Sequence, residues 1–309
     1  MPGISRDVRR LRRAIERDQL RLVYQPKADM RTGRIVGVEA LARWHSPRRG
    51  VVYPDYFIPR VERSDATLKL MTGWTLREAL HQARAWQLAG HDLSVAVNLS
   101  PRSVFDTDLV ADIGRLLSEA QAPPTLIQLE LTETAVFGIA DPERVSEVLR
   151  ELSDMGLLLA LDDFGTGYSS LSRLRDLPIN KVKIDKSFVL RMDERPNDML
   201  IVRSVIALAK SLGLRVVAEG VERDAVWRQL TDLGCDVAQG NYLSPPLPPD
   251  ELIPWVRQWE ELYEEAHRMA TELLERRFGT PDRRSGIDDR RIIWPHQGAR
   301  ILPRRGRAR

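Results

Sequence analysis

Cysteine is nearly missing from this 309-residue chain: Cys235 stands alone, so no disulfide can form within the chain. A single cysteine is typical of a reducing compartment, and we expect a cytoplasmic location. No stretch approaches the roughly 20 consecutive apolar residues that span a bilayer. The basic first twenty residues lack the apolar segment of a secretory signal. The five histidines show no HExxH or other paired spacing, which argues against a zinc site.

A large excess of one charge is also absent, because the net charge of the chain is only +3. Residues 279–309 contain nine Arg and three Asp, a net charge of +6, so the rest of the chain carries −3. The body of the protein therefore lacks the basic excess of nucleic-acid-binding domains. The Arg-, Pro- and Gly-rich tail is predicted to be disordered. We expect a solvated extension and leave open that it contacts an anionic partner such as nucleic acid or membrane lipid.

What the sequence does contain is an alternation of short apolar runs with amphipathic segments. Strands are expected at 20–26, 34–41, 93–98, 126–131, 157–162, 181–185, 215–219 and 236–239, and helices at 67–88, 107–119, 143–154, 199–211 and 225–233. Eight strands alternating with helices predict an α/β fold, a (β/α)8 barrel of the TIM type. The short turn "ADMRTG" between the first two runs predicts a hairpin, and hence one antiparallel strand.

Seven of these runs carry a polar residue near the carboxyl end, on the face opposite the apolar one. These residues are Glu39, Asn98, Glu130, Asp162, Asp163, Lys183, Glu219 and Gln239. Strand side chains alternate between faces, so this polar face would line the lumen. The carboxyl-terminal mouth is where barrel enzymes hold their catalytic residues. Five carboxylates would repel one another there without cations, and the pattern therefore predicts a metal site.

Carboxylate and amide oxygens favour Mg²⁺ or Mn²⁺ as the metal. Five carboxylates exceed the needs of one ion, so we expect two ions about 3.5–4 Å apart, bridged by Asp162, a pair suited to in-line displacement at phosphorus. Lys183 has two interpretations. It is an amine of lowered pKa that positions or deprotonates the attacking water, or it balances the charge of Asp163 or Asp185.

Eight motifs, in order and over about residues 8–262, resemble those of the EAL domain family. They are "YQP" at 24–26, "EALARW" at 39–44, "VNLS" at 97–100, "ELTE" at 130–133, "DDFGTGYSSL" from Asp162, "KIDKSFV" from Lys183, "AEGVE" at 218–222 and "QG" at 239–240. The resemblance implies a modified TIM barrel with one antiparallel strand. It also implies hydrolysis of cyclic di-GMP to linear pGpG by a water that two metal ions activate. The alternative is a weak or inactive cyclic di-GMP receptor, or a protein-interaction module.

The resemblance further implies a role for each matching residue. One ion would be held by Glu39, Asn98, Glu130 and Asp162, and the second by Asp162, Asp163 and Glu219. Lys183 would orient or deprotonate the water, with Gln239 and Glu222 supporting the site and Glu133 anchoring the loop at 164–174. The expected catalytic residues are thus Lys183, Glu39, Asp163, Glu133 and Glu222. The substrate would be contacted by Gln25, Leu41, Gln239, Asp185 at a guanine edge and Arg43 at a phosphate.

Two positions depart from the family pattern: Asn241 stands where an aromatic residue is usual, and Pro245 where Lys or Arg is usual. In the family this segment lies beside the guanine-binding site, so both departures affect the expected contacts with guanine. We expect a flexible N-terminus at 1–7, the phosphodiesterase barrel at 8–262, a helical extension at 263–278 and the disordered tail at 279–309. No GGDEF, sensory or receiver pattern precedes Leu11. We therefore expect the input signal to come through a partner, oligomerisation, substrate supply or the tail. A homodimer is expected, and a regulatory protein partner is left open.

Overall fold

The computed structural model describes residues 6–137, 141–167 and 171–278. All its strands belong to one mixed sheet. They are β1 (Leu20–Asp29), β2 (Ile35–Ser46), β3 (Gly50–Val52), β4 (Ser94–Asn98), β5 (Ile127–Thr132), β6 (Leu158–Phe164), β7 (Lys181–Ile184), β8 (Arg215–Ala218) and β9 (Val237–Gln239). Each of the eight runs expected to be a strand forms one, whereas β3 was not foreseen.

The sheet closes on itself. Its strand order is β1-β9-β8-β7-β6-β5-β4-β2-β3, and β1 also pairs with β2, so eight strands of the described chain form a barrel with β3 attached to β2. Strand β1 runs antiparallel to both of its neighbours, while the other pairings around the barrel are parallel. The expected modified TIM barrel with one antiparallel strand is confirmed.

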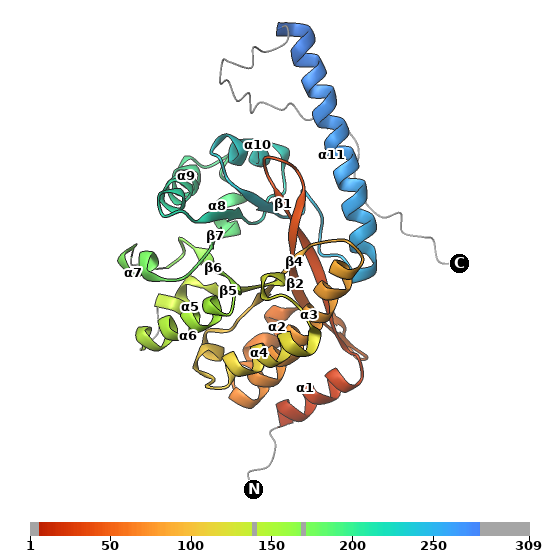
Figure 1. Cartoon of the computed structure of the whole chain (residues 1–309), viewed down its shortest axis with the longest axis vertical. Helices are drawn as coiled ribbons and strands as arrows, with labels where there is room; N and C mark the ends of the chain where they lie inside the picture. The colour runs from red at the N-terminus through yellow and green to blue at the C-terminus, as the bar shows by residue number, and fades with distance from the viewer. Residues whose placement is uncertain (1–5, 138–140, 168–170, 279–309) are drawn as a thin grey trace, which may run out of the picture. The chain divides into compact units, whose positions relative to one another are not determined.

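Helices surround the barrel strands (Figure 1). The α-helices of the first part of the chain are α1 (Arg6–Glu16), α2 (Pro54–Val61), α3 (Asp65–Leu88), α4 (Leu109–Ala120), α5 (Glu133–Phe137), α6 (Pro142–Asp154), α7 (Leu171–Asp176), α8 (Lys186–Val189), α9 (Pro196–Ser211) and α10 (Asp224–Asp232). Two short 3₁₀ helices are η1 (Pro101–Phe105) and η2 (Pro124–Leu126). Because α1 begins at Arg6, residues 6 and 7 of the segment expected to be flexible are helical, and residues 1–5 lie outside the described chain.

Strand β5 shows how the barrel separates its two faces. Leu129 and Leu131 are buried on one face, and Gln128 and Glu130 are buried on the other. Glu130 contacts Lys27 of β1 and Lys183 of β7, neither of which is a neighbour of β5 in the sheet. Such contacts run through the inside of the barrel, so the polar face of the strands lines the lumen.

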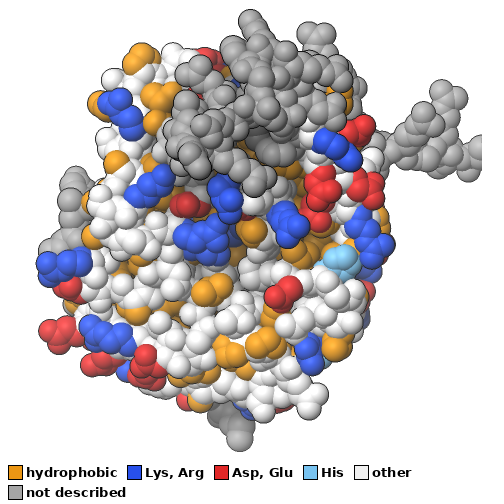
Figure 2. All heavy atoms as spheres, turned by 45° about the horizontal axis from the view of Figure 1, so that its top comes forward, with side chains coloured by type: hydrophobic (Ala, Val, Ile, Leu, Met, Phe, Trp, Pro, Cys, Tyr) orange, Lys and Arg blue, Asp and Glu red, His pale blue; other side chains and the backbone are white. Residues whose placement is uncertain are grey.

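Helix α11 (Pro249–Phe278) confirms the expected C-terminal helix. The chain divides within this helix into a compact unit that ends at Trp255 and a second that begins at Val256. The tail at 279–309, expected to be disordered, lies outside the described residues. No helix in the described part of the chain is long and apolar enough to cross a bilayer. On the face drawn in Figure 2, basic and acidic side chains are interspersed, without one sign covering the surface.

Candidate active site

Lys183 of β7 lies at the centre of the polar cluster in the lumen. Its side chain is fully buried, and its Nζ lies 2.5 Å from Glu130 Oε2 and 2.8 Å from Asp162 Oδ2. Two further carboxylates approach the same ammonium, with Glu219 Oε1 at 2.6 Å and Glu39 Oε2 at 3.9 Å. The barrel therefore gathers four of the five expected acids around one lysine.

Amide side chains fix the orientation of Glu39. Asn98 Nδ2 donates to Glu39 Oε1 at 2.6 Å, and Gln239 Nε2 donates to Glu39 Oε2 at 2.6 Å. Gln239 Nε2 also donates to Gln25 Oε1 at 2.9 Å, and Gln25 lies opposite Glu39 in the β1–β2 ladder. Four of the residues named from the sequence thus form one hydrogen-bonded group at the β1–β2 side of the lumen.

A bulge in β6 explains how two adjacent aspartates serve one site. The pairing of β6 with β7 shifts register between Leu161 and Phe164, and Asp163 has a left-handed backbone with φ of 55°. Aspartate tolerates this conformation better than most residues, and the Asp163 amide donates to Asp162 Oδ1 at 2.8 Å. Carboxylate oxygens of Asp162, Asp163 and Glu219 consequently all lie within 4.8 Å of one another, although consecutive strand residues normally point apart.

The donors at this point fit a divalent cation. Three carboxylates that supply only oxygen ligands match Mg²⁺, Mn²⁺ or Ca²⁺ rather than a thiophilic metal. Burial, together with neighbouring acids, raises the pKa of Asp162 to about 6 and that of Glu219 to about 8. A bound cation would relieve this repulsion. The acidic cluster can therefore hold a metal ion.

Glu130 has the opposite electrostatic balance. Although burial disfavours its charge, the ammonium groups of Lys183 and Lys27 lower the pKa of Glu130 to about 2. Lys27 Nζ lies 2.5 Å from Glu130 Oε1, which also accepts from Gln128 Nε2 at 2.7 Å. Both Glu130 oxygens thus have lysine partners in this structure.

The expectation of a lowered pKa at Lys183 assumed neighbouring metal ions, and it stays a prediction for the metal-bound site. Burial lowers the pKa of the ammonium, but Glu130, Glu39, Glu219 and Asp162 together raise it well above its usual value. With these four acids around it and no cation to neutralise them, the amine is a charged donor. Its ion pairs are with Glu130, Asp162 and Glu219, and not with the Asp163 or Asp185 that the charge-balance interpretation named.

Glu133 lies just beyond β5, at the first residue of α5. It is almost fully buried, and its Oε2 accepts from the amides of Gly165 at 2.8 Å and Gly167 at 3.4 Å. A Cβ on Gly167 would lie 3.0 Å from Glu133 Oε1. Glu133 therefore holds the start of the loop that follows the two aspartates, of which residues 168–170 lie outside the described chain.

Four further expected site residues lie outside the ammonium-centred cluster. Glu222 is exposed and accepts from Asn241 Nδ2 at 3.3 Å. Asp185 follows β7 and caps α8 by accepting from the Ser187 amide at 2.9 Å. The remaining two residues lie on β2. Leu41 is half-buried, and the Arg43 guanidinium lies 4.9 Å from the centre of the Tyr53 ring.

Sequence reasoning missed two lysines in the lumen. Lys27 binds Glu130, and Lys181 Nζ donates to Gln128 Oε1 at 2.5 Å. The signal was present, because Lys27 lies two residues from Gln25 and Lys181 two residues from Lys183, on the same faces of their strands. A strict two-residue alternation would have placed both lysines in the lumen.

This arrangement is that of a barrel protein whose polar mouth gathers acids, amides and one central lysine. The EAL domain family model matches residues 8–246, and the chain belongs to this family. It is 41% identical over 244 residues, 79% of the chain, to the bifunctional diguanylate cyclase/cyclic di-GMP phosphodiesterase MucR of Pseudomonas aeruginosa. It is 38% identical over 237 residues, 77% of the chain, to the cyclic di-GMP phosphodiesterase PA2567 of the same organism.

The chain spans little more than a third of these two relatives, 35% of MucR and 40% of PA2567. Among solved structures, the PaMucR phosphodiesterase in its c-di-GMP complex matches with a TM-score of 0.76 and 39% identity. That match covers 80% of this chain and all of the solved chain. The fold of the barrel is thus shared with an EAL domain that holds this nucleotide.

Proposed function

We propose that this chain hydrolyses cyclic di-GMP to linear pGpG with the help of two divalent cations, Mg²⁺ or Mn²⁺. The observation that carries the proposal is the convergence of Glu39, Asn98, Glu130, Asp162, Asp163 and Glu219 around buried Lys183 at one end of the lumen. A receptor would need only nucleotide contacts, whereas this surplus of buried carboxylates suits metal-assisted displacement at phosphorus. Membership of the EAL family supports the same activity.

The proposed ligands of the first ion are Glu39, Asn98, Glu130 and Asp162, and those of the second are Asp162, Asp163 and Glu219. When bound, the cations would activate a water and neutralise the charge that develops on the phosphodiester. The amides of Asn98 and Gln239 hold Glu39 in one orientation, so its carboxylate is already placed for binding. Lys27 and Lys183 would have to release part of Glu130 for it to act as a ligand.

The chain's own polar groups would bind and orient the substrate. Charged Lys183 would donate to the attacking water and keep its oxygen directed at phosphorus. A P–O bond to that water would form as the P–O bond to a ribose oxygen breaks, and the proton that the water loses would be balanced by the proton that the leaving oxygen gains. Arg43 offers a planar guanidinium to a phosphate. The remaining proposed contacts are Gln25, Gln239 and Leu41 near the mouth, and Asp185 at a guanine edge.

The test is the cleavage of cyclic di-GMP by the purified chain with Mg²⁺ or Mn²⁺, with pGpG separated by chromatography. Glu39→Ala should abolish turnover, because it removes a ligand that two amides hold in place. Glu151→Ala on the exposed face of α6 should retain full activity as the matched control. Nucleotide binding without pGpG formation would overturn the proposal in favour of a receptor or protein-interaction module.

Partners and location stay predictions. A homodimer is expected, and light scattering across a range of protein concentrations would detect it. A regulatory protein partner is left open, and a cytoplasmic location is expected from the sequence alone.

A further inference from the structure

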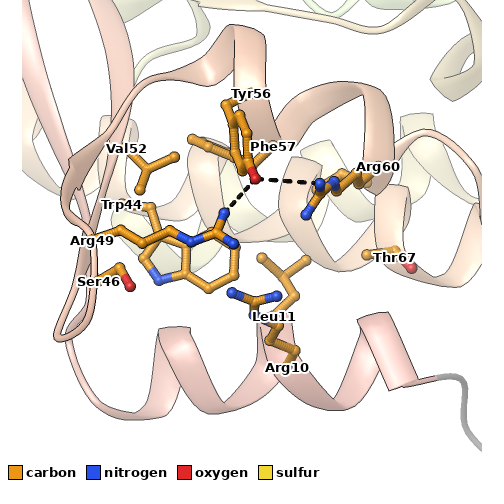
Figure 3. A pocket seen from close by; sticks show the side chains of 11 residues that line it. Arg10, Leu11, Trp44, Ser46, Arg49, Val52, Tyr56, Phe57, Arg60 and Thr67 are labelled. Atoms are coloured by element: carbon orange, nitrogen blue, oxygen red, sulfur yellow. Dashed lines mark hydrogen bonds between the residues drawn. The ribbon is translucent and has the colours of Figure 1, made fainter.

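A pocket lies on the outer side of β2, away from the lumen. Helix α1, the hairpin of β2 and β3, helix α2 and the first turn of α3 line it (Figure 3). Trp44 of β2 and Phe57 of α2 form part of its apolar wall, with their ring centres 5.8 Å apart. The pocket encloses a volume of about 40 Å³. That volume exceeds the roughly 10–15 Å³ that one water needs, so the space can admit a group larger than a water molecule.

Three arginines from three different elements surround this space. Arg10 comes from α1, Arg49 from the β2–β3 turn and Arg60 from α2 (Figure 3). The Arg10 guanidinium lies 5.1 Å from the centre of the Trp44 ring. Arg49 and Arg60 both donate to the Tyr56 hydroxyl, the latter at 3.4 Å.

No carboxylate of the described residues forms an ion pair with these three arginines, whose recorded contacts are with Trp44 and Tyr56. Other arginines of the same unit do have acidic partners, for example Arg102 with Asp65 at 2.6 Å and Arg223 with Asp193 at 2.6 Å. All three are exposed, so water screens the repulsion between their charges, and their guanidinium groups are accessible to an anionic partner.

Two of the residues that line the pocket carry an orphaned polar group. Trp44 Nε1 and Thr67 Oγ1 are both buried without a hydrogen-bond partner within the described chain. Thr67 is 1% exposed, so surrounding solvent does not satisfy its hydroxyl. Buried polar groups are nearly always paired, and each exception calls for a partner. An indole N–H can only donate, so a group rich in acceptor oxygens would satisfy it.

We propose that this pocket binds a phosphate group, presented by a soluble phosphorylated molecule or by a lipid headgroup. Guanidinium groups match the oxygens of phosphate in a planar, forked geometry. The occupant would accept from the arginines that ring the pocket and from the indole N–H of Trp44. Trp44 directly follows Arg43 in β2, so the occupant lies behind a residue proposed to contact substrate.

The indole N–H of Trp44 provides a direct readout. In ¹H–¹⁵N spectra of the full chain, inorganic phosphate at constant ionic strength should shift one indole resonance saturably. Trp44→Phe should remove that resonance and so assign it. The double variant Arg49→Gln/Arg60→Gln should weaken the apparent affinity by about tenfold or more, because each charge-assisted hydrogen bond contributes substantially to binding.

The chain offers a matched control. Arg48 and Arg63 are exposed, lie one and three residues from the two pocket arginines, and do not line the pocket. Arg48→Gln/Arg63→Gln makes the same change of charge and should bind phosphate like the unmodified chain. Equal weakening in both double variants, or no saturable shift of the Trp44 resonance with any probe, would overturn the proposal.

The two sources of phosphate are separated by the choice of probe. A shift with adenosine monophosphate assigns a soluble ligand. Co-sedimentation with phosphatidic acid vesicles but not with neutral vesicles, lost in Arg49→Gln/Arg60→Gln and kept in the control, assigns a headgroup. Circular dichroism of each variant checks that it is folded. None of these readouts depends on turnover, so a failure of the proposed phosphodiesterase activity would leave the result on this pocket intact.

Discussion

Lys183 Nζ lies 2.5 Å from Glu130 Oε2, and both side chains are completely excluded from solvent. A buried ion pair of this kind loses its hydration on folding, and its attraction compensates only when the remaining polar atoms are satisfied. Glu130 meets that condition through Lys27 and Gln128, and Lys183 through Asp162 and Glu219. The network is therefore stable only as a whole, and its members should not be removable one at a time.

Replacing the central lysine tests this interdependence. Lys183→Met should lower the free energy of unfolding by about 3–5 kcal/mol, because it leaves buried carboxylates without their cation. Urea unfolding of the metal-free protein measures the loss. The double variant Lys183→Met/Glu130→Gln should recover part of it, since one uncompensated charge is gone. Lys210→Met, at an exposed position of α9, is the control and should change stability by less than about 0.5 kcal/mol. Purely additive effects of the two lumen substitutions would contradict this account.

The role of Glu133 in holding the loop after β6 can be tested at the Gly165 amide. Glu133→Ala removes the acceptor of the Gly165 N–H, so exchange of this amide with solvent should become faster. Glu133→Gln keeps one acceptor oxygen and should preserve part of the protection. Hydrogen exchange followed by NMR reports both. Unchanged protection of Gly165 in Glu133→Ala would show that another group holds the loop.

The glycine after Gln239 is required by close packing of backbone. A Cβ on Gly240 would lie 2.2 Å from the carbonyl oxygen of Val221, and no side-chain rotation relieves such a contact. Gly240→Ala should destabilise the protein by about 3 kcal/mol or more, the upper end of the usual range for overpacking. Gly213→Ala is the matched control, because its φ is +73° but nothing lies near the added Cβ, and it should cost only about 1 kcal/mol. Equal losses in thermal unfolding would mean that the Val221 contact relaxes.

Lys181 should give the stability a measurable dependence on pH. Burial, with repulsion from Lys27 and Arg215, lowers the pKa of Lys181 to about 8 from 10.5. Below pH 8 the ammonium is charged in both states and its burial disfavours folding in full. Between about 8 and 10.5 the unfolded chain binds more protons, so stability rises with pH as this penalty disappears.

The comparison that isolates this effect is with Lys181→Met. The difference in unfolding free energy between the two proteins should change in favour of the unmodified chain between pH 7 and pH 10, because the other titrating groups cancel. Urea unfolding at both pH values measures it. A constant difference would indicate that Lys181 keeps its ordinary pKa in the folded state.

The sequence predicted the strands and much of the site for one physical reason. Apolar residues at every second position make a strand visible, and the intervening polar residues, such as Glu130 of β5, then fall on one face. Because parallel strands end at one rim, Glu39, Asp162, Lys183 and Glu219 were expected to meet, and they do. Strand β3 was not predicted, because three residues are too few to show an alternation of apolar and polar side chains.

Other features depend on the surroundings of a residue rather than on its spacing. The bulge at Asp162 and Asp163 comes from a register shift against β7, which the local sequence pattern of β6 does not predict. The raised pKa of Lys183 follows from the number of acids that surround it in the folded barrel, a number that sequence order does not supply. Likewise, Arg10, Arg49 and Arg60 belong to three different elements, and only the packing of α1 and α2 beside β2 brings them together.

The reversed direction of β1 determines where the chain enters the barrel. Leu20 at its start pairs with Trp44 near the end of β2, and Gln19 accepts from the His45 amide at 2.6 Å. In an all-parallel barrel the first strand would begin at the floor, far from the polar mouth. Here helix α1 leads into β1 opposite Trp44, at the rim itself. Helix α1 is therefore connected to the polar mouth directly, and not through the length of a strand.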